Sequence, residues 1–207
     1  MFRNRREAAE LLADRLEAYR GRHPLVLAIP RGGVPMGRIV ADALDGELDV
    51  VLVHKLGAPG NPEYAIGSVD ESGNVEVSAA VSRYGIGQDY IEREAREQQK
   101  KMSERRARYG RPPAEARDRI AIVVDDGVAT GSTLLAALKA VRSRGPEKVV
   151  AAIGVAPADA IRRLDAVADE VVCLDAPADF YAVGQFFREF EQVTDDEVIR
   201  LLGEGAA

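Results

Sequence analysis

Short apolar runs recur along this chain, and most are rich in β-branched residues and bounded by charge or turn residues. Such runs are typical of strands that are buried on both faces of a parallel sheet. They predict core strands at residues 25–29, 48–53, 120–124, 148–155 and 170–174. Segments with apolar residues at helical spacing lie between most of them. The alternation predicts an α/β fold with a mostly parallel, twisted sheet, flanked by helices and joined by right-handed crossovers.

Several helical segments carry recognisable ends. An amphipathic helix is predicted over residues 4–20 with Asn4 as its N-cap, and a long charged helix over residues 89–108. Acidic residues four positions ahead of basic ones support the charged helix, which we interpret as solvated. Thr194 opens a final helix with a capping-box pattern. Further helices are expected at residues 34–44, 134–144 and 158–166.

The middle of the chain departs from the alternation. Residues 56–63 hold two glycines and two prolines, which argues against regular structure there. Residues 64–69 and 74–77 are interpreted as a hairpin with a turn at 70–73. Residues 111–117, which contain paired prolines, are interpreted as a linker.

Composition narrows the class of protein. A length of 207 residues suits one domain, or one domain with a small appendage. The net charge of −6 disfavours nucleic acid as a partner, although residues 105–117 form a local basic stretch. The single cysteine, Cys173, allows no internal disulfide, and no Cys/His cluster has zinc spacing. No apolar run approaches a membrane span and no signal peptide is recognised, so a cytoplasmic protein without a membrane partner is expected.

Candidate chemistry follows three of the predicted strands. The groups are Arg31-Gly32-Gly33, His54-Lys55 and Asp125-Asp126. Ligands of open α/β sheets bind at the carboxyl ends of the strands. If these strands are neighbours, the three groups line one cleft. For His54, a packing or solvent-facing role is an equal alternative.

The acid pair leads into a loop of small residues and then a helix. Residues 127–132 have little side-chain bulk, so their backbone N–H groups can approach phosphate oxygens. Thr130, Ser132 and Thr133 add hydroxyl donors, and the helix N-terminus favours an anion. The two acids can accept hydrogen bonds from sugar hydroxyls or hold a hydrated metal ion. This layout is typical of a site for a phosphorylated sugar, and it matches neither a P-loop nor a dinucleotide-binding fingerprint.

Residues 123–133, Val-Val-Asp-Asp-Gly-Val-Ala-Thr-Gly-Ser-Thr, resemble the phosphoribosyl-pyrophosphate (PRPP) signature of the type I phosphoribosyltransferases. The resemblance implies the type I fold with a small hood subdomain, and PRPP bound with Mg²⁺. Asp125 and Asp126 would then address the ribose hydroxyls, directly or through Mg²⁺ and water. The implied 5′-phosphate loop consists of Gly127, Val128, Ala129, Thr130, Gly131, Ser132 and Thr133.

The same resemblance places pyrophosphate at the other two strand ends. Arg31, Gly32 and Gly33 match the family's pyrophosphate loop, which often contains a non-proline cis peptide, here expected between Arg31 and Gly32. Lys55 matches a basic residue that contacts the pyrophosphate. Residues 55–68 match a flexible catalytic loop that closes over the site, with a plain surface loop as the alternative.

The resemblance also divides the chain. It implies one phosphoribosyltransferase domain over residues 1–207, with a core at about 20–175 and a C-terminal hood segment at about 176–207. Phe180 or Tyr181 in that segment would stack on the acceptor base. An aromatic core beneath the final helix is the alternative interpretation.

Two positions depart from the 6-oxopurine enzymes of the family. Ala129 stands where those enzymes carry a carboxylate, and Ala156 stands where they carry a lysine that reads the purine oxygen. The Ala-Thr-Gly loop is similar to that of adenine and uracil enzymes, but neither base-recognition pattern is complete. The acceptor is therefore expected to be a nitrogenous base of unassigned identity.

Together these features imply a PRPP-dependent phosphoribosyltransferase, a pentosyl-transferring enzyme of nucleotide metabolism that releases pyrophosphate. Its implied catalytic residues are Asp125, Asp126, Lys55 and Arg31. The family is usually dimeric or larger, so a homo-oligomer is expected. Two alternatives stay open: a regulator of the same fold that binds PRPP or a nucleotide without turnover, and a phosphatase or phosphorylase for a related sugar phosphate.

Overall fold

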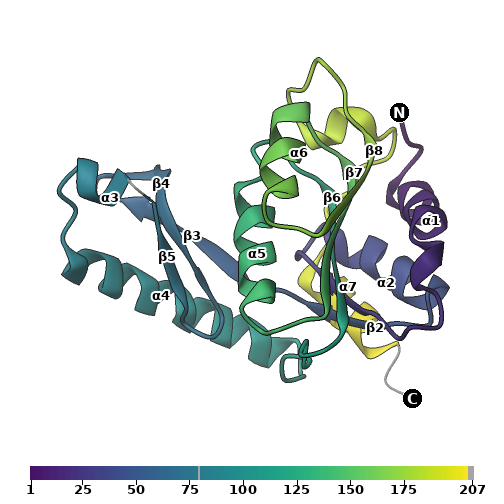
Figure 1. Cartoon of the computed structure of the whole chain (residues 1–207), viewed down its shortest axis with the longest axis horizontal. Helices are drawn as coiled ribbons and strands as arrows, with labels where there is room; N and C mark the ends of the chain where they lie inside the picture. Colours follow the sequence, from purple (N-terminus) through teal and green to yellow (C-terminus); the bar gives the residue numbers. More distant parts are fainter. Residues whose placement is uncertain (79, 205–207) are drawn as a thin grey trace. The chain divides into compact units, whose positions relative to one another are not determined.

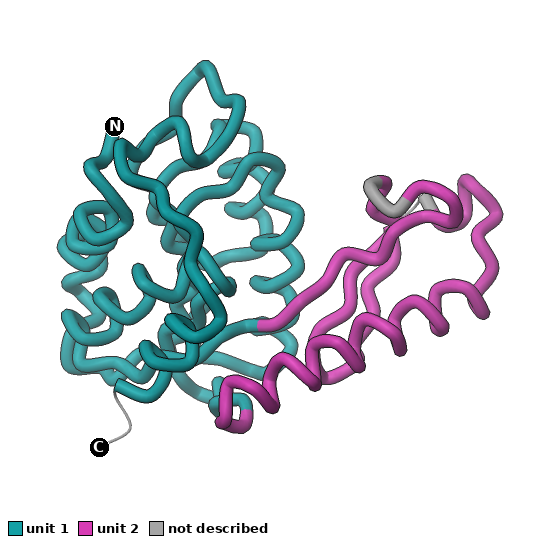
Figure 2. Tube along the Cα trace, turned by 180° about the vertical axis from the view of Figure 1, so that it is seen from behind, with its two compact units in different colours: residues 1–51, 113–207 teal, residues 52–112 magenta. Residues whose placement is uncertain are grey.

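The chain forms two compact units. The computed structural model describes residues 1–78 and 80–204, and the side chains at positions 62, 63 and 80 lie outside that description. Unit 1 comprises Met1–Val51 and Pro113–Ala207, and unit 2 comprises Leu52–Pro112 (Figure 2). This division differs from the predicted single domain with a C-terminal hood. The second unit comes from the middle of the chain, and the described part of the C-terminal segment belongs to unit 1.

Unit 1 is built on a five-stranded sheet of order β2-β1-β6-β7-β8, in which every neighbouring pair is parallel. The strands are β1 (Leu25–Ala28), β2 (Glu47–Val50), β6 (Ile120–Gly127), β7 (Lys148–Val155) and β8 (Glu170–Asp175). The apolar side chains of the central strands β1, β6 and β7 are almost fully buried. The predicted parallel sheet is confirmed, and its central strands are apolar because both of their faces are covered.

Helices lie on both faces of this sheet. Figure 1 shows α5 and α6 on one side and α1 and α2 on the other. The helices are α1 (Arg5–Arg15), α2 (Gly33–Ala43), α5 (Ser132–Arg142), α6 (Ala158–Asp165) and α7 (Asp195–Gly203), with 3-10 turns η1 (Glu17–Tyr19) and η2 (Val183–Phe186). The predicted N-cap of the first helix is confirmed, because the side chain of Asn4 accepts a hydrogen bond from the N–H of Glu7 at 3.2 Å.

Strand β6 is longer than predicted. It does not stop before the acid pair but continues through Asp125 and Asp126 to Gly127. The reason is its neighbour β7, which pairs with it as far as Val155. The backbone of both acids is therefore fixed by sheet hydrogen bonding rather than by a loop.

Unit 2 contains a three-stranded antiparallel sheet of order β3-β4-β5 and two helices. Its elements are β3 (Val53–Ala58), β4 (Asn61–Asp70), β5 (Val75–Val77), α3 (Ala80–Arg83) and α4 (Gln88–Arg108). The predicted hairpin and the charged helix are both confirmed. Helix α4 carries the expected ion pairs on its exposed surface, for example Lys101 with Glu97 at 2.9 Å.

The expectation of an irregular segment at residues 56–63 is wrong. Strand β3 runs to Ala58 and β4 begins at Asn61, so Pro59 and Gly60 alone form the connection. Proline is tolerated at turns and strand starts, where its missing N–H breaks no ladder hydrogen bond. The predicted closure of this hairpin over a site stays a prediction.

Thr194 closes the N-terminus of α7, because its hydroxyl oxygen accepts a hydrogen bond from the N–H of Glu197 at 3.1 Å. Alanine at this position would leave that N–H unpaired. We expect Thr194→Ala to lower the free energy of unfolding by about 1 kcal/mol, measured by urea denaturation. Thr194→Ser keeps the oxygen and should remain near wild type. Equal stability of the alanine variant and the wild type would contradict the contribution of this cap.

Candidate active site

Two of the three predicted groups, Arg31-Gly32-Gly33 and Asp125-Asp126, meet at the carboxyl ends of the strands of the main sheet. Strands β1 and β6 are adjacent and parallel, with Ala28 opposite Val124, so the chain leaving β1 reaches the acid pair. The approach is close enough that a Cβ on Gly32 would overlap the carboxylate of Asp126. Any larger residue at this position would have to displace the carboxylate of Asp126.

A cavity of about 430 Å³ opens at these strand ends. Its walls come from three places: the first helix, the loop after β1 with the acid pair, and the C-terminal segment. The lining residues are Arg5, Ile29, Pro30, Arg31, Gly32, Asp125, Asp126, Phe190, Glu191, Gln192 and Val193. The cavity thus combines two cations, two carboxylates of the acid pair and one aromatic ring.

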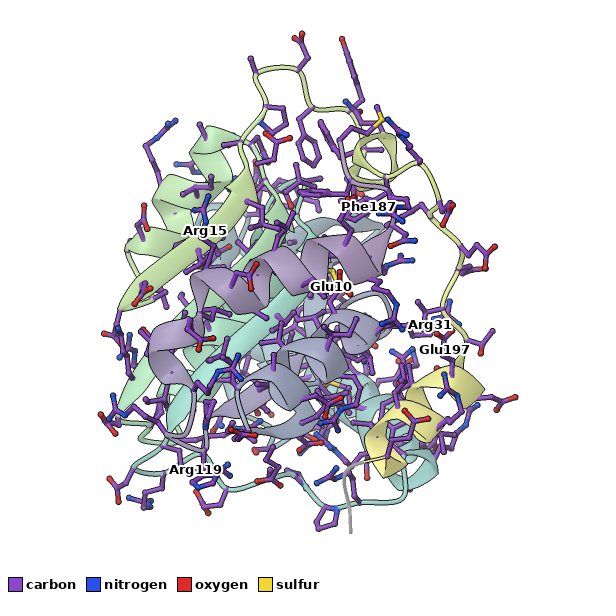
Figure 3. The ribbon with its side chains drawn as sticks, turned by 90° about the vertical axis from the view of Figure 1, so that its right-hand side faces the viewer. Glu10, Arg15, Arg31, Arg119, Phe187 and Glu197 are labelled. Carbon is purple, nitrogen blue, oxygen red and sulfur yellow. The ribbon has the colours of Figure 1, made fainter. Side chains whose placement is uncertain are left out.

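The loop after β1 contributes Arg31, which is labelled in Figure 3. Its side chain makes no hydrogen bond or ion pair with any residue that the structure describes. A cis peptide is present in this loop, at Pro30–Arg31 rather than at the predicted Arg31–Gly32. Helix α2 begins directly afterwards at Gly33. Arg31 is therefore a cation that remains available to an anionic ligand.

The surroundings of Asp125 and Asp126 disfavour the ionised form of both carboxyl groups. Burial raises the pKa of the Asp125 carboxyl well above its usual range, and the neighbouring Asp126 raises it further. Burial also raises the pKa of Asp126, although Arg5 opposes this shift. Arg5 Nε donates to Asp126 Oδ2 at 2.8 Å, and both side chains are nearly buried, with exposed fractions of 14% and 11%. Such arrangements are typical of functional sites.

The predicted phosphate loop forms the connection between β6 and α5. The N–H groups of Ala129, Thr130, Gly131 and Thr133 donate no hydrogen bond to any residue in the described part of the chain. Gly131 adopts a left-handed conformation with φ of +74° and precedes the first turn of α5. These unpaired donors at a helix N-terminus suit a phosphate group.

The first two residues of the predicted loop are hydrogen-bonded to the neighbouring strand β7. Gly127 pairs with Val155 as the last residue of β6, and the N–H of Val128 donates to the carbonyl oxygen of Val155 at 3.0 Å. The N–H of Val128 is thus already used. The part of the loop that offers free donors begins at Ala129.

Lys55 is not at the end of a strand of the main sheet. Strand β2 ends at Val50, and Lys55 is an exposed residue within β3 of unit 2. The same holds for His54. The chain leaves the main sheet earlier than the apolar pattern indicated, since residues 51–53 are also apolar and hide the boundary. A role of Lys55 in pyrophosphate binding stays a prediction.

The structure brings a different aromatic residue to the cavity from those predicted. Phe180 packs on Phe186 with ring centroids 5.0 Å apart, and Tyr181 is 87% exposed. Neither is among the described residues that line the cavity, whereas Phe190 is. The aromatic enrichment of residues 179–190 was the available signal, but composition could not select the ring.

Arg5 is the second residue that sequence reasoning does not single out. It is one of three arginines among the first six residues, and nothing local distinguishes it from Arg3 or Arg6. Its partner Asp126 lies 121 positions away in the chain. The interaction follows only from the folded path of the backbone.

Two further features are absent from the described residues. Within residues 1–78 and 80–204, no helix is both long and apolar enough to cross a membrane. The same residues contain no cluster of three or more His, Cys, Asp or Glu side chains that could hold a metal ion. A metal at this cavity would therefore need ligands beyond the acid pair.

Comparison with known proteins gives consistent matches over most of the chain. A family model described as "Phosphoribosyl transferase domain" matches residues 3–189. Two proteins from strains of Mycobacterium tuberculosis, each named as a putative phosphoribosyl transferase, are 42% identical over 206 residues. The match covers 98% of this chain and 46% of those proteins, so the chain spans about half the length of these curated relatives.

Solved structures match as well. The protein TT1426 from Thermus thermophilus is 48% identical, with a TM-score of 0.90 and coverage of 100% of this chain and 99% of that one. The AQ2163 protein from Aquifex aeolicus is 14% identical, with a TM-score of 0.52 and coverage of 87% and 78%. The second match supports the fold alone.

Proposed function

Because the chain belongs to the phosphoribosyl transferase domain family, we propose that it transfers a 5-phosphoribosyl group from Mg²⁺-bound PRPP to a nitrogenous base and releases pyrophosphate. The observation that carries the proposal is the meeting of Gly32 with Asp126 at adjacent strand ends. It joins a candidate pyrophosphate loop to a candidate ribose site. The candidate phosphate loop follows the acid pair directly along the chain, between β6 and α5.

Each part of PRPP has a chemically suitable partner. The 5′-phosphate would lie at the N-terminus of α5, where unpaired N–H groups and the helix dipole favour an anion. Ser132 and Thr133 add hydroxyl donors. The carboxylates of Asp125 and Asp126 would accept hydrogen bonds from the ribose hydroxyls. Arg31 would neutralise charge on the pyrophosphate.

The acid pair also fits a magnesium ion that arrives with the substrate. Mg²⁺ usually takes one or two protein carboxylates together with substrate phosphates and water. Asp125 and Asp126 supply two such oxygen ligand groups, and the described residues hold no larger cluster. Bound there, the ion would supply charge neutralisation for the leaving pyrophosphate.

The proposed reaction needs no covalent bond between the protein and the substrate. A bond forms between the acceptor nitrogen and C1 of the ribose, while the bond from C1 to pyrophosphate oxygen breaks and its electron pair leaves with pyrophosphate. The proton of the acceptor N–H is released to solvent. Positive charge develops on the ribose ring, close to the two carboxylates. Arg31 stabilises the departing negative charge, and the cavity holds the reactants in position.

Turnover with a panel of nucleobases tests the proposal. The protein is incubated with PRPP, Mg²⁺ and each base in turn, and both pyrophosphate and nucleotide are measured. We expect PRPP to bind with micromolar affinity and at least one base to yield both products in equal amounts. Binding without product for any base would overturn the transferase assignment and favour a PRPP-binding regulator. Absence of PRPP binding would overturn the site itself.

A further inference from the structure

The N-terminal residues lie beside the C-terminal segment, which forms part of the cavity wall. The N–H of Phe2 donates to the carbonyl oxygen of Phe186 at 2.8 Å, and the N–H of Arg188 donates back to Phe2 at 3.0 Å. The N–H of Glu189 continues this row to the carbonyl oxygen of Arg3 at 2.9 Å. We call residues 2–5 together with residues 186–191 the terminal clasp.

Side chains reinforce the clasp. The rings of Phe2 and Phe187 are both buried, with centroids 5.3 Å apart, and Figure 3 shows Phe187 close to the start of α1. Asn4 Nδ2 donates to Glu189 Oε2 at 2.9 Å. The backbone and side-chain contacts together hold the first residues in one path relative to the C-terminal segment.

Arg5 is the last residue of the N-terminal part of the terminal clasp, and its side chain contacts the acid pair. Its Nε donates to Asp126 Oδ2 at 2.8 Å, and its Nη1 donates to the carbonyl oxygen of Glu191 at 2.7 Å. The guanidinium carbon lies 3.9 Å from the centroid of the Phe190 ring. A planar group with several donors in fixed directions suits all three partners at once, whereas a lysine ammonium presents its donors from a single nitrogen on a flexible stem.

We propose that Arg5 is a positioning residue for the proposed transfer: it fixes the carboxylate of Asp126 and holds the Phe190–Val193 wall of the cavity against the acid pair. The inference rests on the proposed function. Arg5 acts through Asp126 and the C-terminal segment and is not assigned a contact with the substrate.

The contacts favour positioning over competition with the ribose. Two of the three partners of Arg5, the Glu191 carbonyl and the Phe190 ring, do not involve Asp126. The guanidinium is therefore held in place when substrate arrives. A carboxylate accepts several hydrogen bonds, so Asp126 can serve Arg5 and a hydroxyl together. Removal of Arg5 should consequently weaken PRPP binding rather than strengthen it.

The test compares Arg5→Ala and Arg5→Lys with Arg6→Ala as the matched control. Arg6 lies next to Arg5 on α1, is 73% exposed, and pairs only at 4.0 Å with Glu10. The affinity for PRPP with Mg²⁺ is measured by calorimetry, and thermal unfolding is followed in parallel. In metal sites, loss of a residue that orients a ligating carboxylate typically costs 10- to 100-fold in affinity or activity. We expect about this loss for Arg5→Ala, a smaller loss for Arg5→Lys, and no change for Arg6→Ala.

Added methylguanidine separates positioning from general stability. Alanine at position 5 leaves a space of matching shape, so millimolar methylguanidine should restore part of the PRPP affinity of Arg5→Ala and leave that of Arg6→Ala unchanged. Unchanged or tighter PRPP binding by Arg5→Ala would overturn the inference. So would a loss that methylguanidine does not reverse and that parallels a fall in thermal stability. If Arg5→Ala does not fold, unchanged affinity of Arg5→Lys overturns it instead.

Failure of the inference and failure of the proposed function give different results. If wild-type protein does not bind PRPP, the proposed function fails before any variant is compared. If the wild type binds and the Arg5 variants bind equally well, only the positioning role of Arg5 fails.

Discussion

Asp125→Asn is expected to make the protein more stable and, at the same time, to weaken its binding of PRPP. Burial raises the pKa of the Asp125 carboxyl well above its ordinary value, and the charge of Asp126 raises it further. The folded protein therefore holds the ionised form at a cost. Asparagine has the same shape without the charge, and its oxygen can still accept the N–H of Asp126, which Asp125 accepts at 3.0 Å.

The stability gain should depend on pH in one direction. Above the folded-state pKa, Asp125 is ionised in both the folded and the unfolded protein, and ionisation disfavours the fold. As the pH falls through that pKa, the folded protein takes up the proton first and the penalty begins to shrink, and it is gone only below the lower pKa of the unfolded chain. The gain from Asp125→Asn should be fully present above the folded-state pKa of Asp125 and should vanish below the lower pKa of the unfolded chain.

PRPP affinity should fall because the ribose hydroxyls lose a charged acceptor. Hydrogen bonds to charged groups contribute about 1.5–3 kcal/mol, which corresponds to about 10- to 100-fold in Kd. Thermal unfolding at several pH values and calorimetric titration with PRPP and Mg²⁺ measure the two effects. Asp165→Asn, at an exposed position at the end of α6, is the control. Unchanged affinity in Asp125→Asn would rule out its ribose role, and lower stability would contradict the electrostatic cost.

Gly154→Ala adds one methyl group to the sheet beside the site, and we expect this addition to lower the stability of the fold strongly. A Cβ at Gly154 in β7 would overlap the backbone carbonyl oxygen of Asp126 in the adjacent strand β6, and it would lie 3.6 Å from Phe187. Backbone held by a parallel ladder cannot move aside as a flexible side chain can. We expect a loss of about 3 kcal/mol in the free energy of unfolding, or failure to fold.

Gly203→Ala provides the matched control, because no atom lies within 4 Å of the position of its Cβ at the end of α7. The control should be unchanged or up to about 0.5 kcal/mol more stable, since alanine suits a helix better than glycine. Chemical denaturation of both variants measures the difference. Wild-type stability of Gly154→Ala would show that β6 and β7 can separate locally, and would contradict the rigid placement of Asp126.

The main sheet and one half of the site could be predicted from local pattern. Apolar, β-branched runs such as 120–124 indicate a strand that is buried on both faces. The charged or turn residues that bound such a run mark where the strand ends. The acid pair and the small-residue loop are consecutive in the sequence, so one contiguous motif identifies both. Gly32 was placed near this motif because neighbouring parallel strands bring their carboxyl ends together.

The middle of the chain shows where local pattern was insufficient. Residues 51–53 continue the apolar run of β2, although the main sheet ends at Val50 and unit 2 begins at Leu52. Hydrophobicity reports that a residue is buried but not which sheet buries it. The position predicted for Lys55 was wrong for this reason, and glycine and proline in residues 56–63 proved to mark a tight turn within a hairpin.

By itself, the sequence determined the α/β class, the central strands of the parallel sheet and the position of the small-residue loop after the acid pair, because each depends on residues that are close together in the chain. Only the tertiary structure selected Arg5 among similar arginines and Phe190 among several aromatic residues. Those choices depend on contacts between segments more than a hundred residues apart. Such contacts are set by the path of the folded backbone, and no local pattern of charge or hydrophobicity encodes them.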